Sequence, residues 1–384
     1  MRHWLLFTPI LVAALGYGIS FPLLAIVLDN NGVNAGTIGL ISAMPALGWL
    51  IVQPFLPFLQ TKFSTKTLLL LFLSVAAISI LGFALTSDLA AWFALRFIFG
   101  GSLGLFFRVG EYWVNVVTKT ENRGRITGAY SFSFFFGIAL GSLIQPEIGQ
   151  SGFFPFLSVS AALLLGGLLI LPTKDKTVSE PVSVEDHSNG MIPSRLLLLL
   201  PLAAFGVIVY GVFEDIPAYL ISVYALRVGF EDDIAAYTLT AFALGGLVFP
   251  MPIGILSDKI GRQPTLTICA VIGAMGALAI PFALSSATAF LLVLFVWGGC
   301  VSCIYSVTIS MIGDRYRGKD LANANAGFGM FYALAALVGP IINGFSMQAW
   351  EPHGLFVPSF ILFTLLTVFS LTWKLAAQKG PAPA

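Results

Sequence analysis

Five ionisable residues lie inside long apolar runs of this 384-residue chain. Arg96, Arg108 and Glu111 share one run, and Glu214 and Asp215 share another. A charged side chain in the middle of a bilayer costs about 2.5–3.5 kcal/mol on insertion scales, so it is expected to face a cavity or a partner. Such groups can form ion pairs and can take up or release protons. We therefore interpret the five residues as candidates for proton coupling in a central cavity.

The first three charges share one face of a helix. At about 100° per residue, with Arg96 at zero, Glu111 falls at about 60° and Arg108 at about 120°. This stripe is predicted to face the interior of a helix bundle and not lipid. Arg108 and Glu111 stand three residues apart and can pair directly. Either Glu111 exchanges a proton while Arg108 competes for its carboxylate, or the two form a static ion pair near the cytoplasmic end.

The other two charges come just before Pro217, a residue that disturbs helices. Neighbouring helix positions point about 100° apart, so Glu214 and Asp215 are not expected to face the same cleft. Asp215 is the better cavity candidate, because it aligns with the polar residue Ser20 in an internal repeat, whereas Glu214 aligns with Ile19. Alternatively, Pro217 frees backbone groups and both carboxylates lie in a wet outer vestibule.

The composition is typical of a membrane protein. Hydrophobic residues make up 58% of the chain and charged residues 10%, and the mean hydropathy is +0.93. A soluble protein is about a quarter charged, so lipid must solvate most of the surface. The net charge of +1 gives no reason to expect nucleic acid. Cys269, Cys300 and Cys303 lie in apolar runs, and we expect buried packing thiols there instead of a metal or redox site.

Hydropathy predicts an all-α membrane protein with twelve spans, each long enough to cross a hydrocarbon core of about 30 Å. The approximate limits are 4–28, 38–60, 67–86, 90–116, 125–146, 152–171, 196–223, 234–257, 264–284, 288–313, 321–346 and 354–376. Most Lys and Arg residues fall in the terminal segments and in alternate loops, whereas the opposite loops are acidic except for Arg227. By the positive-inside rule, both termini are predicted to be cytoplasmic. The first apolar run lacks a small-residue cleavage site and is expected to be retained as a span.

A hydrophilic stretch divides these spans into two sets of six. We expect a first bundle at 1–171, a flexible cytoplasmic linker at 172–194, a second bundle at 195–376 and a tail at 377–384. The sets align at a shift of about 195 residues, which favours a duplication, although Gly and Pro are common in membrane helices anyway. The aligned pairs are Gly16 and Pro22 with Gly211 and Pro217, and Arg123, Gly124 and Pro146 with Arg317, Gly318 and Pro340. Repeated bundles around a shared cleft suit alternating access.

A short charged turn lies between two apolar runs at residues 250–266. A helix that leaves the bilayer, turns in water and re-enters would have this order. The turn follows the pattern Gly254-x-x-x-Asp258-Lys259-x-Gly261-Arg262. This pattern resembles the signature loop of the major facilitator superfamily of secondary transporters, and nearly all of the chain resembles a twelve-helix member of that superfamily.

The same turn is predicted to act as a cytoplasmic gate. We expect Arg262 to pair with Asp314 near the end of the tenth span, and Asp258 to cap the next helix or to accept hydrogen bonds from a helix N-terminus across the interface. Such contacts would close the inner side and break when it opens. The alternative is a hairpin fixed by positive-inside charge alone.

Three further motifs resemble a bacterial branch of YcaD-like transporters within the superfamily: Leu95-Arg96-Phe97-x-x-Gly100, Glu111, and Asn122-Arg123-Gly124-Arg125. The resemblance implies a multi-pass protein of the bacterial inner membrane that carries a small solute, with protons as a second partner. It also implies that Arg96, which matches a buried arginine of the family, acts in proton coupling or substrate contact. Two departures weaken parts of the pattern: residues 60–66 lack the family's Asp and Gly, and the antiporter motif that ends at Gln145-Pro146 is incomplete.

Aromatic residues with a polar end are the best candidates for lining the cavity, because lipid would leave that end unpaired. We expect Tyr17, Tyr130, Tyr210 and Tyr305 to line it, together with Ser20. A cavity with aromatic walls and few charges would suit a hydrophobic or amphipathic solute.

The sequence contains no visible phosphate loop, metal-spaced cluster or nucleophile triad, so we expect neither an enzyme nor a cofactor. The predicted function is proton-coupled export of an amphipathic compound by a monomer. Uptake of a small metabolite, lipid movement between leaflets, and a non-transporting sensor or scaffold of the same fold are the alternatives.

Overall fold

A computed structural model describes residues 4–117, 123–173 and 200–379, and within these ranges the chain is entirely helical, without strands. The tail predicted at 377–384 and the linker predicted at 172–194 lie largely outside these ranges. The helices of the N-terminal half are α1 (Trp4–Asn30), α2 (Ala35–Val52), η1 (Gln53–Phe55), α3 (Leu56–Lys62), α4 (Thr65–Phe83), α5 (Leu89–Val117), α6 (Arg123–Ile148) and α7 (Phe154–Ile170). Those of the C-terminal half are α9 (Pro201–Asp215), η4 (Ile216–Leu220), α10 (Ile221–Arg227), α11 (Asp232–Val248), α12 (Pro250–Ile260), α13 (Arg262–Ala279), η5 (Ile280–Phe282), α14 (Ala287–Arg315), α15 (Gly318–Ala349), η6 (His353–Phe356) and α16 (Val357–Lys379).

The predicted membrane spans correspond to these helices. Ten helical stretches of the described chain are long and apolar enough to cross a membrane, and the pair α11 and α12, bent by 42°, makes an eleventh if it is one span. The apolar helix α7 has 17 residues, which corresponds to about 26 Å at 1.5 Å per residue and is close to a hydrocarbon core. The all-helical fold expected from hydropathy is therefore confirmed, because helices satisfy their own backbone hydrogen bonds in lipid.

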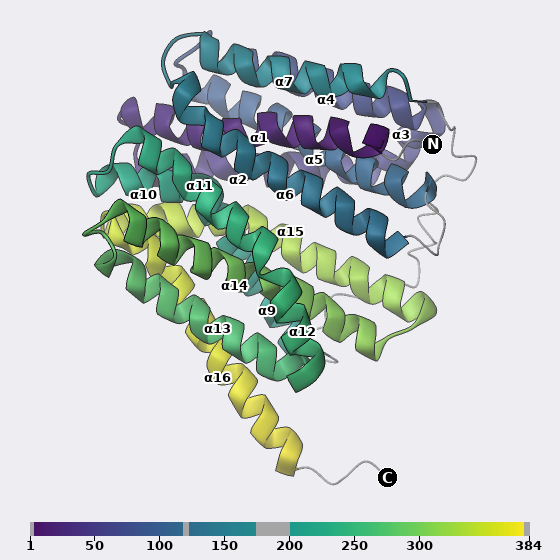
Figure 1. Ribbon diagram of the computed structural model, residues 1–384, viewed down its shortest axis with the longest axis vertical. Helices are drawn as coiled ribbons and strands as arrows, with labels where there is room; N and C mark the ends of the chain where they lie inside the picture. The colour runs from purple at the N-terminus through teal and green to yellow at the C-terminus, as the bar shows by residue number, and fades with distance from the viewer. Residues whose placement is uncertain (1–3, 118–122, 174–199, 380–384) are drawn as a thin grey trace.

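The helices gather in two groups (Figure 1). In the N-terminal half, α1 packs on α6 and α7, and α5 packs on α2 and α4. In the C-terminal half, α14 packs on α9, α11 and α13, and α13 packs on α16. Two seams join the groups, one between α2 and α15 and the other between α6 and α11.

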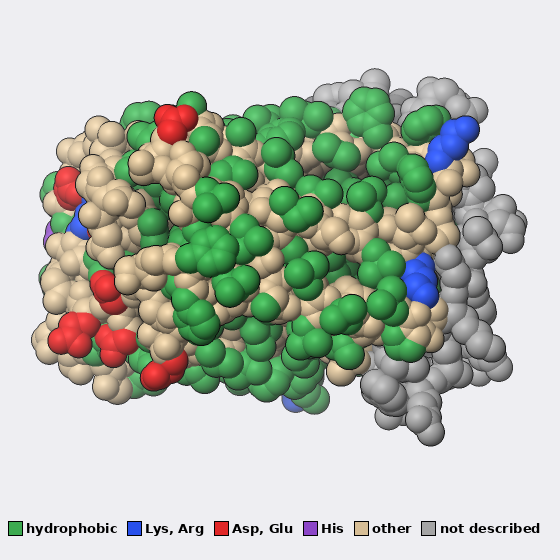
Figure 2. All heavy atoms as spheres, turned by 90° about the horizontal axis from the view of Figure 1, so that it is seen from above, with side chains coloured by type: hydrophobic (Ala, Val, Ile, Leu, Met, Phe, Trp, Pro, Cys, Tyr) green, Lys and Arg blue, Asp and Glu red, His purple; other side chains and the backbone are tan. Residues whose placement is uncertain are grey.

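Charged side chains lie at two opposite ends of the molecule, with an apolar band between them (Figure 2). We call one end the acidic end; its acidic residues are Asp29, Asp88, Glu147, Glu231, Asp232, Asp233 and Glu351. We call the other the basic end; its described basic residues include Lys62, Lys66, Lys259, Arg262, Arg315 and Arg317. Large exposed apolar side chains between the ends, such as Phe132 and Leu168, suit contact with lipid.

The two halves are held together toward the acidic end. Arg227 of α10 forms an ion pair with Asp29 of α1 at 2.8 Å, and it also pairs with Glu351. The backbone N–H of Gly36 donates to the side chain of Gln348 at 3.2 Å across the α2–α15 seam. Both members of the Arg227–Asp29 pair are largely buried, with 16% and 13% of their side chains exposed, so little water screens this contact.

Glycine makes the α2–α15 seam possible. A Cβ atom on Gly39 would lie 2.3 Å from the carbonyl oxygen of Pro340, and one on Gly344 would lie 2.6 Å from that of Ala35. Because real Cβ atoms do not approach oxygen so closely, only glycine allows these two backbones to touch.

Candidate functional site

Arg96 of α5 lies in the interior, where 1% of its surface is exposed. Its Cζ atom lies 4.4 Å from the ring centroid of Tyr219 in η4 and 5.9 Å from that of Phe99. These distances allow cation–π contacts with both rings. The Nη1 and Nη2 atoms of the guanidinium have no hydrogen-bond partner. Arg96 is thus a desolvated positive charge held by aromatic faces, with two nitrogen atoms that make no hydrogen bond.

Asp215 belongs to the opposite half and lies within electrostatic range of Arg96. It ends α9, and the π-helical turn Ile216–Leu220 begins directly after it. Pro217 lies inside this turn and cannot donate a backbone hydrogen bond, which explains why the regular helix is interrupted here. Turns of this kind are frequent at functional sites. The turn brings Tyr219 against Arg96 and so joins the two halves at this point.

Glu214, the neighbour of Asp215, has different partners. Its carboxylate accepts a hydrogen bond from the hydroxyl of Tyr332 in α15, and a longer one of 3.5 Å from Tyr210. The rings of Tyr210, Tyr305 and Tyr332 lie with their centroids 5.5 to 6.3 Å apart. We call these three residues the tyrosine cage. The side chains of Glu214 and Asp215 are both half-buried. Because they leave adjacent positions of α9, they point in different directions and have different neighbours.

Arg108 and Glu111 form the ion pair that the spacing predicts, with 3.5 Å between Nη1 and Oε2. Both side chains are 46% exposed, and the guanidinium lies 5.6 Å from the Trp49 ring. The predicted contact between the two side chains is therefore present, at a position on α5 that water can reach.

The residues expected to line a cavity have different degrees of exposure. Tyr17 and Tyr305 are half-buried, whereas Tyr130 and Tyr210 are 8% and 9% exposed. The Tyr130 hydroxyl donates to the carbonyl oxygen of Phe107 at 2.7 Å. Ser20 is fully buried, and its hydroxyl donates to the carbonyl oxygen of Tyr17, so it is closed off in this conformation.

Two contact residues were missed by the sequence analysis. Tyr219 stacks on Arg96, and Tyr332 binds Glu214. Both are tyrosines inside apolar runs, so the rule that selected Tyr210 and Tyr305 would also have selected them. The sequence alone does not indicate which charged group each of these two tyrosines contacts.

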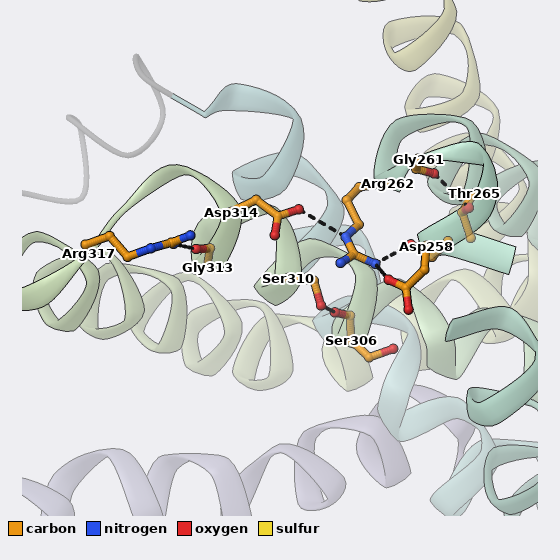
Figure 3. A network of polar contacts seen from close by, with 10 residues as sticks. Asp258, Gly261, Arg262, Thr265, Ser306, Ser310, Gly313, Asp314 and Arg317 are labelled. Carbon is orange, nitrogen blue, oxygen red and sulfur yellow. Dashed lines mark hydrogen bonds and ion pairs between the residues drawn. The ribbon is translucent and has the colours of Figure 1, made fainter. Parts of the chain in front are cut away.

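Three of the predicted gate residues, Asp258, Arg262 and Asp314, form a network at the basic end (Figure 3). Nε of Arg262 donates to Asp314 at 3.1 Å, as expected, and Nη1 donates to Asp258 at 2.6 Å. Gly261 separates α12 from α13 with a φ of +94°, a value that favours glycine. Lys259 is exposed, and a Cβ on Gly254 would point into open space.

Asp258 does not cap α13, because no side chain caps the N-terminus of that helix. Its carboxylate is occupied by Arg262 instead, which lies one turn further along the chain. The network joins α12, α13 and α14, all within the C-terminal half. Arg262 therefore holds the signature turn against α14 in this conformation.

Comparisons with known proteins agree with this architecture. A family model described as Major Facilitator Superfamily matches residues 6–238 and 227–383. A Bacillus subtilis protein named "Uncharacterized MFS-type transporter YfkF" is 29% identical over 97% of this chain and 95% of its own length. An Escherichia fergusonii protein named "Uncharacterized MFS-type transporter YcaD" is 24% identical over 92% and 91%. The predicted likeness to YcaD is confirmed.

The solved structure of a D-xylose-proton symporter has the same fold, with a TM-score of 0.74 over 97% of both chains at 17% identity.

Proposed function

Since the chain belongs to the Major Facilitator Superfamily and the curated relatives that it matches are named as transporters, we propose that it exports an amphipathic solute in exchange for protons. The solute would pass between the two halves by alternating access, the mechanism that repeated bundles support. The observation that carries the proposal is the contact of Arg96, a buried cation with two unpaired nitrogen atoms, with Tyr219 of the opposite half, in the turn that follows Asp215.

The distribution of charge supports an orientation. Because Lys and Arg gather at the basic end, the positive-inside rule assigns that end to the cytoplasm and the acidic end to the outside of a bacterial inner membrane. The Arg227–Asp29 pair and the α2–α15 seam then close the outer side. Arg108 and Glu111, both half-exposed, lie further along α5 than Arg96, toward the basic end, where water or solute can reach them.

Proton coupling follows from charges that change partners. An unpaired buried charge is unfavourable, so a carboxylate that comes into contact with Arg96 stabilises it. Movement between the halves changes the distance from Arg96 to Asp215, because the two residues belong to different halves. We assign to Glu111 the exchange of a proton, and Arg108, whose Nη1 atom lies 3.5 Å from its carboxylate, is the cation that competes for it.

The test is transport by the purified protein in proteoliposomes with an imposed pH gradient. Radiolabelled amphipathic compounds should move against their own gradient when protons flow the opposite way, and an ionophore that collapses the pH gradient should stop the movement. Expression in a sensitive host should also protect it from such compounds. Movement of a nutrient in the same direction as protons would instead establish uptake, and absence of any solute movement would support a sensor or scaffold.

A further inference from the structure

The tyrosine cage surrounds a carboxylate, and this combination suits a positively charged ligand. Glu214 accepts hydrogen bonds from Tyr332 and Tyr210, and Tyr305 completes the cage from α14. Aromatic faces attract cations through the negative face of the ring, and the attraction grows when water is excluded. Tyr305 and Tyr332 are half-buried, so their rings are accessible to a ligand. Three helices contribute, and the cage is therefore part of the folded interior.

The charged residues of two described helices, α5 and α9, are unbalanced. Arg96 and Arg108 are positive, whereas Glu111, Glu214 and Asp215 are negative, which leaves one excess negative charge when all are ionised. Arg108 pairs with Glu111, and Arg96 lies near Asp215. Glu214 is the remaining carboxylate of these two helices, and it accepts hydrogen bonds from the neutral hydroxyls of Tyr210 and Tyr332. A half-buried negative charge without a cation is less favourable than a paired one, so either a proton or a monovalent cation would complete the site.

We propose that Glu214 and the tyrosine cage bind the cationic group of the transported solute, so that the substrates are amphipathic organic monocations. This inference rests on the proposed function in one respect, which is that the bound cation is taken to be the transported solute. Binding of a cation can be measured without a pH gradient. A proton and the cation compete for one carboxylate, since either neutralises it. Release of the cation when a proton arrives is the coupling that exchange requires.

The groups around Glu214 determine how the affinity for a cation should depend on pH. Tyr210 and Asp215 come from α9, Tyr332 from α15 and Tyr305 from α14. Asp215 is the nearest second acid, and Arg96 faces it from α5. As the pH falls, protonation of Glu214 removes the charge that attracts the ligand, so the affinity for a cation should fall.

The experiment measures equilibrium binding of two probes to the purified full-length protein in detergent. Tetraphenylphosphonium is an amphipathic monocation, and tetraphenylborate has the same shape with a negative charge. We expect the phosphonium to bind at least about ten times more tightly than the borate, a difference of about 1.4 kcal/mol. Lowering the pH should weaken phosphonium binding. Equal affinities, or tighter binding of the borate, would overturn the proposal without any variant.

Variants then locate the site. Glu214→Gln should weaken phosphonium binding by about tenfold and abolish its pH dependence. Tyr332→Leu should weaken it by about fivefold, whereas Tyr332→Phe, which keeps the aromatic face, should stay within about threefold of the unchanged protein. Glu147→Gln, at the exposed acidic end of α6, is the matched control and should bind normally. Unchanged binding in Glu214→Gln would refute the assignment.

The two proposals can fail separately. If the phosphonium binds through Glu214 but no compound moves under a pH gradient, the binding site stands and proton-coupled export is wrong. If another solute is exported under the pH gradient while the phosphonium does not bind, the export proposal is supported and the cation-site proposal is wrong.

Discussion

Arg96 is the single charged side chain among the fully buried polar residues of the described chain. Its free Nη1 and Nη2 atoms make it costly for stability, because an unsatisfied buried donor loses its hydration without replacement. Residues that cost stability in this way are retained where they act on a ligand or a moving partner. Stability and transport should therefore respond in opposite directions when Arg96 is replaced.

We predict that Arg96→Met abolishes both gradient-driven transport and solute counterflow while the thermal midpoint of unfolding stays equal or rises. Methionine fills a similar volume and removes the two unsatisfied guanidinium nitrogen atoms, and each unsatisfied buried group costs about 1–3 kcal/mol. Thermal unfolding followed by intrinsic fluorescence, alongside transport in proteoliposomes, checks both parts. A large fall in the unfolding midpoint would mean that Arg96 is a structural residue.

Glu111 should have a narrower effect. Glu111→Gln keeps the shape of the side chain but cannot exchange a proton, so gradient-driven transport should fall to background while counterflow, which needs no net proton movement, persists. The Arg108–Glu111 pair could instead be a static contact between two side chains that are each 46% exposed. In that case its loss should lower the free energy of unfolding by no more than about 1 kcal/mol and leave transport intact. Retention of pH-driven transport in Glu111→Gln would thus favour the static pair.

At the scale of elements, the α2–α15 seam decides whether the acidic end can close. Gly344 touches the carbonyl oxygen of Ala35, whereas Gly329, on the same helix, has open space around it. Gly344→Val should force the two backbones apart. The ratio of molecules with an open acidic end to molecules with a closed one should then rise by about tenfold or more. Gly329→Val has a comparable intrinsic effect on the helix and no such clash, so it is the control.

Spin labels on Asn31→Cys and Trp350→Cys, which are exposed near this seam, would report the separation by pulsed dipolar spectroscopy. The distance distribution should widen in Gly344→Val and stay unchanged in Gly329→Val. Identical distributions in both variants would show that the seam tolerates a side chain.

The elements also show what a single sequence can and cannot predict. Apolar runs become helices because lipid permits little else, and Arg262 finds Asp314 because both charges lie at neighbouring helix ends. The contacts of Glu214 with Tyr332 and of Arg96 with Tyr219 join residues more than 100 positions apart. The alternation of polar and apolar residues says which face of a helix is buried, but not which helix covers it. The π-helical turn after Asp215 also changes the direction of later side chains in a way that regular periodicity does not anticipate.

At the scale of the whole molecule, the separation of an acidic from a basic end gives a direct test of orientation. Lys259 is exposed at the basic end and Asn31 at the acidic end. The native cysteines are buried, at 0% to 4% exposure, and should react little with a bulky reagent. Asn31→Cys in right-side-out membrane vesicles should react with a membrane-impermeant maleimide, whereas Lys259→Cys should react only after the vesicles are permeabilised. The reverse pattern would place the acidic end in the cytoplasm, and because protons enter from outside, it would also reverse the direction assigned to solute and proton movement.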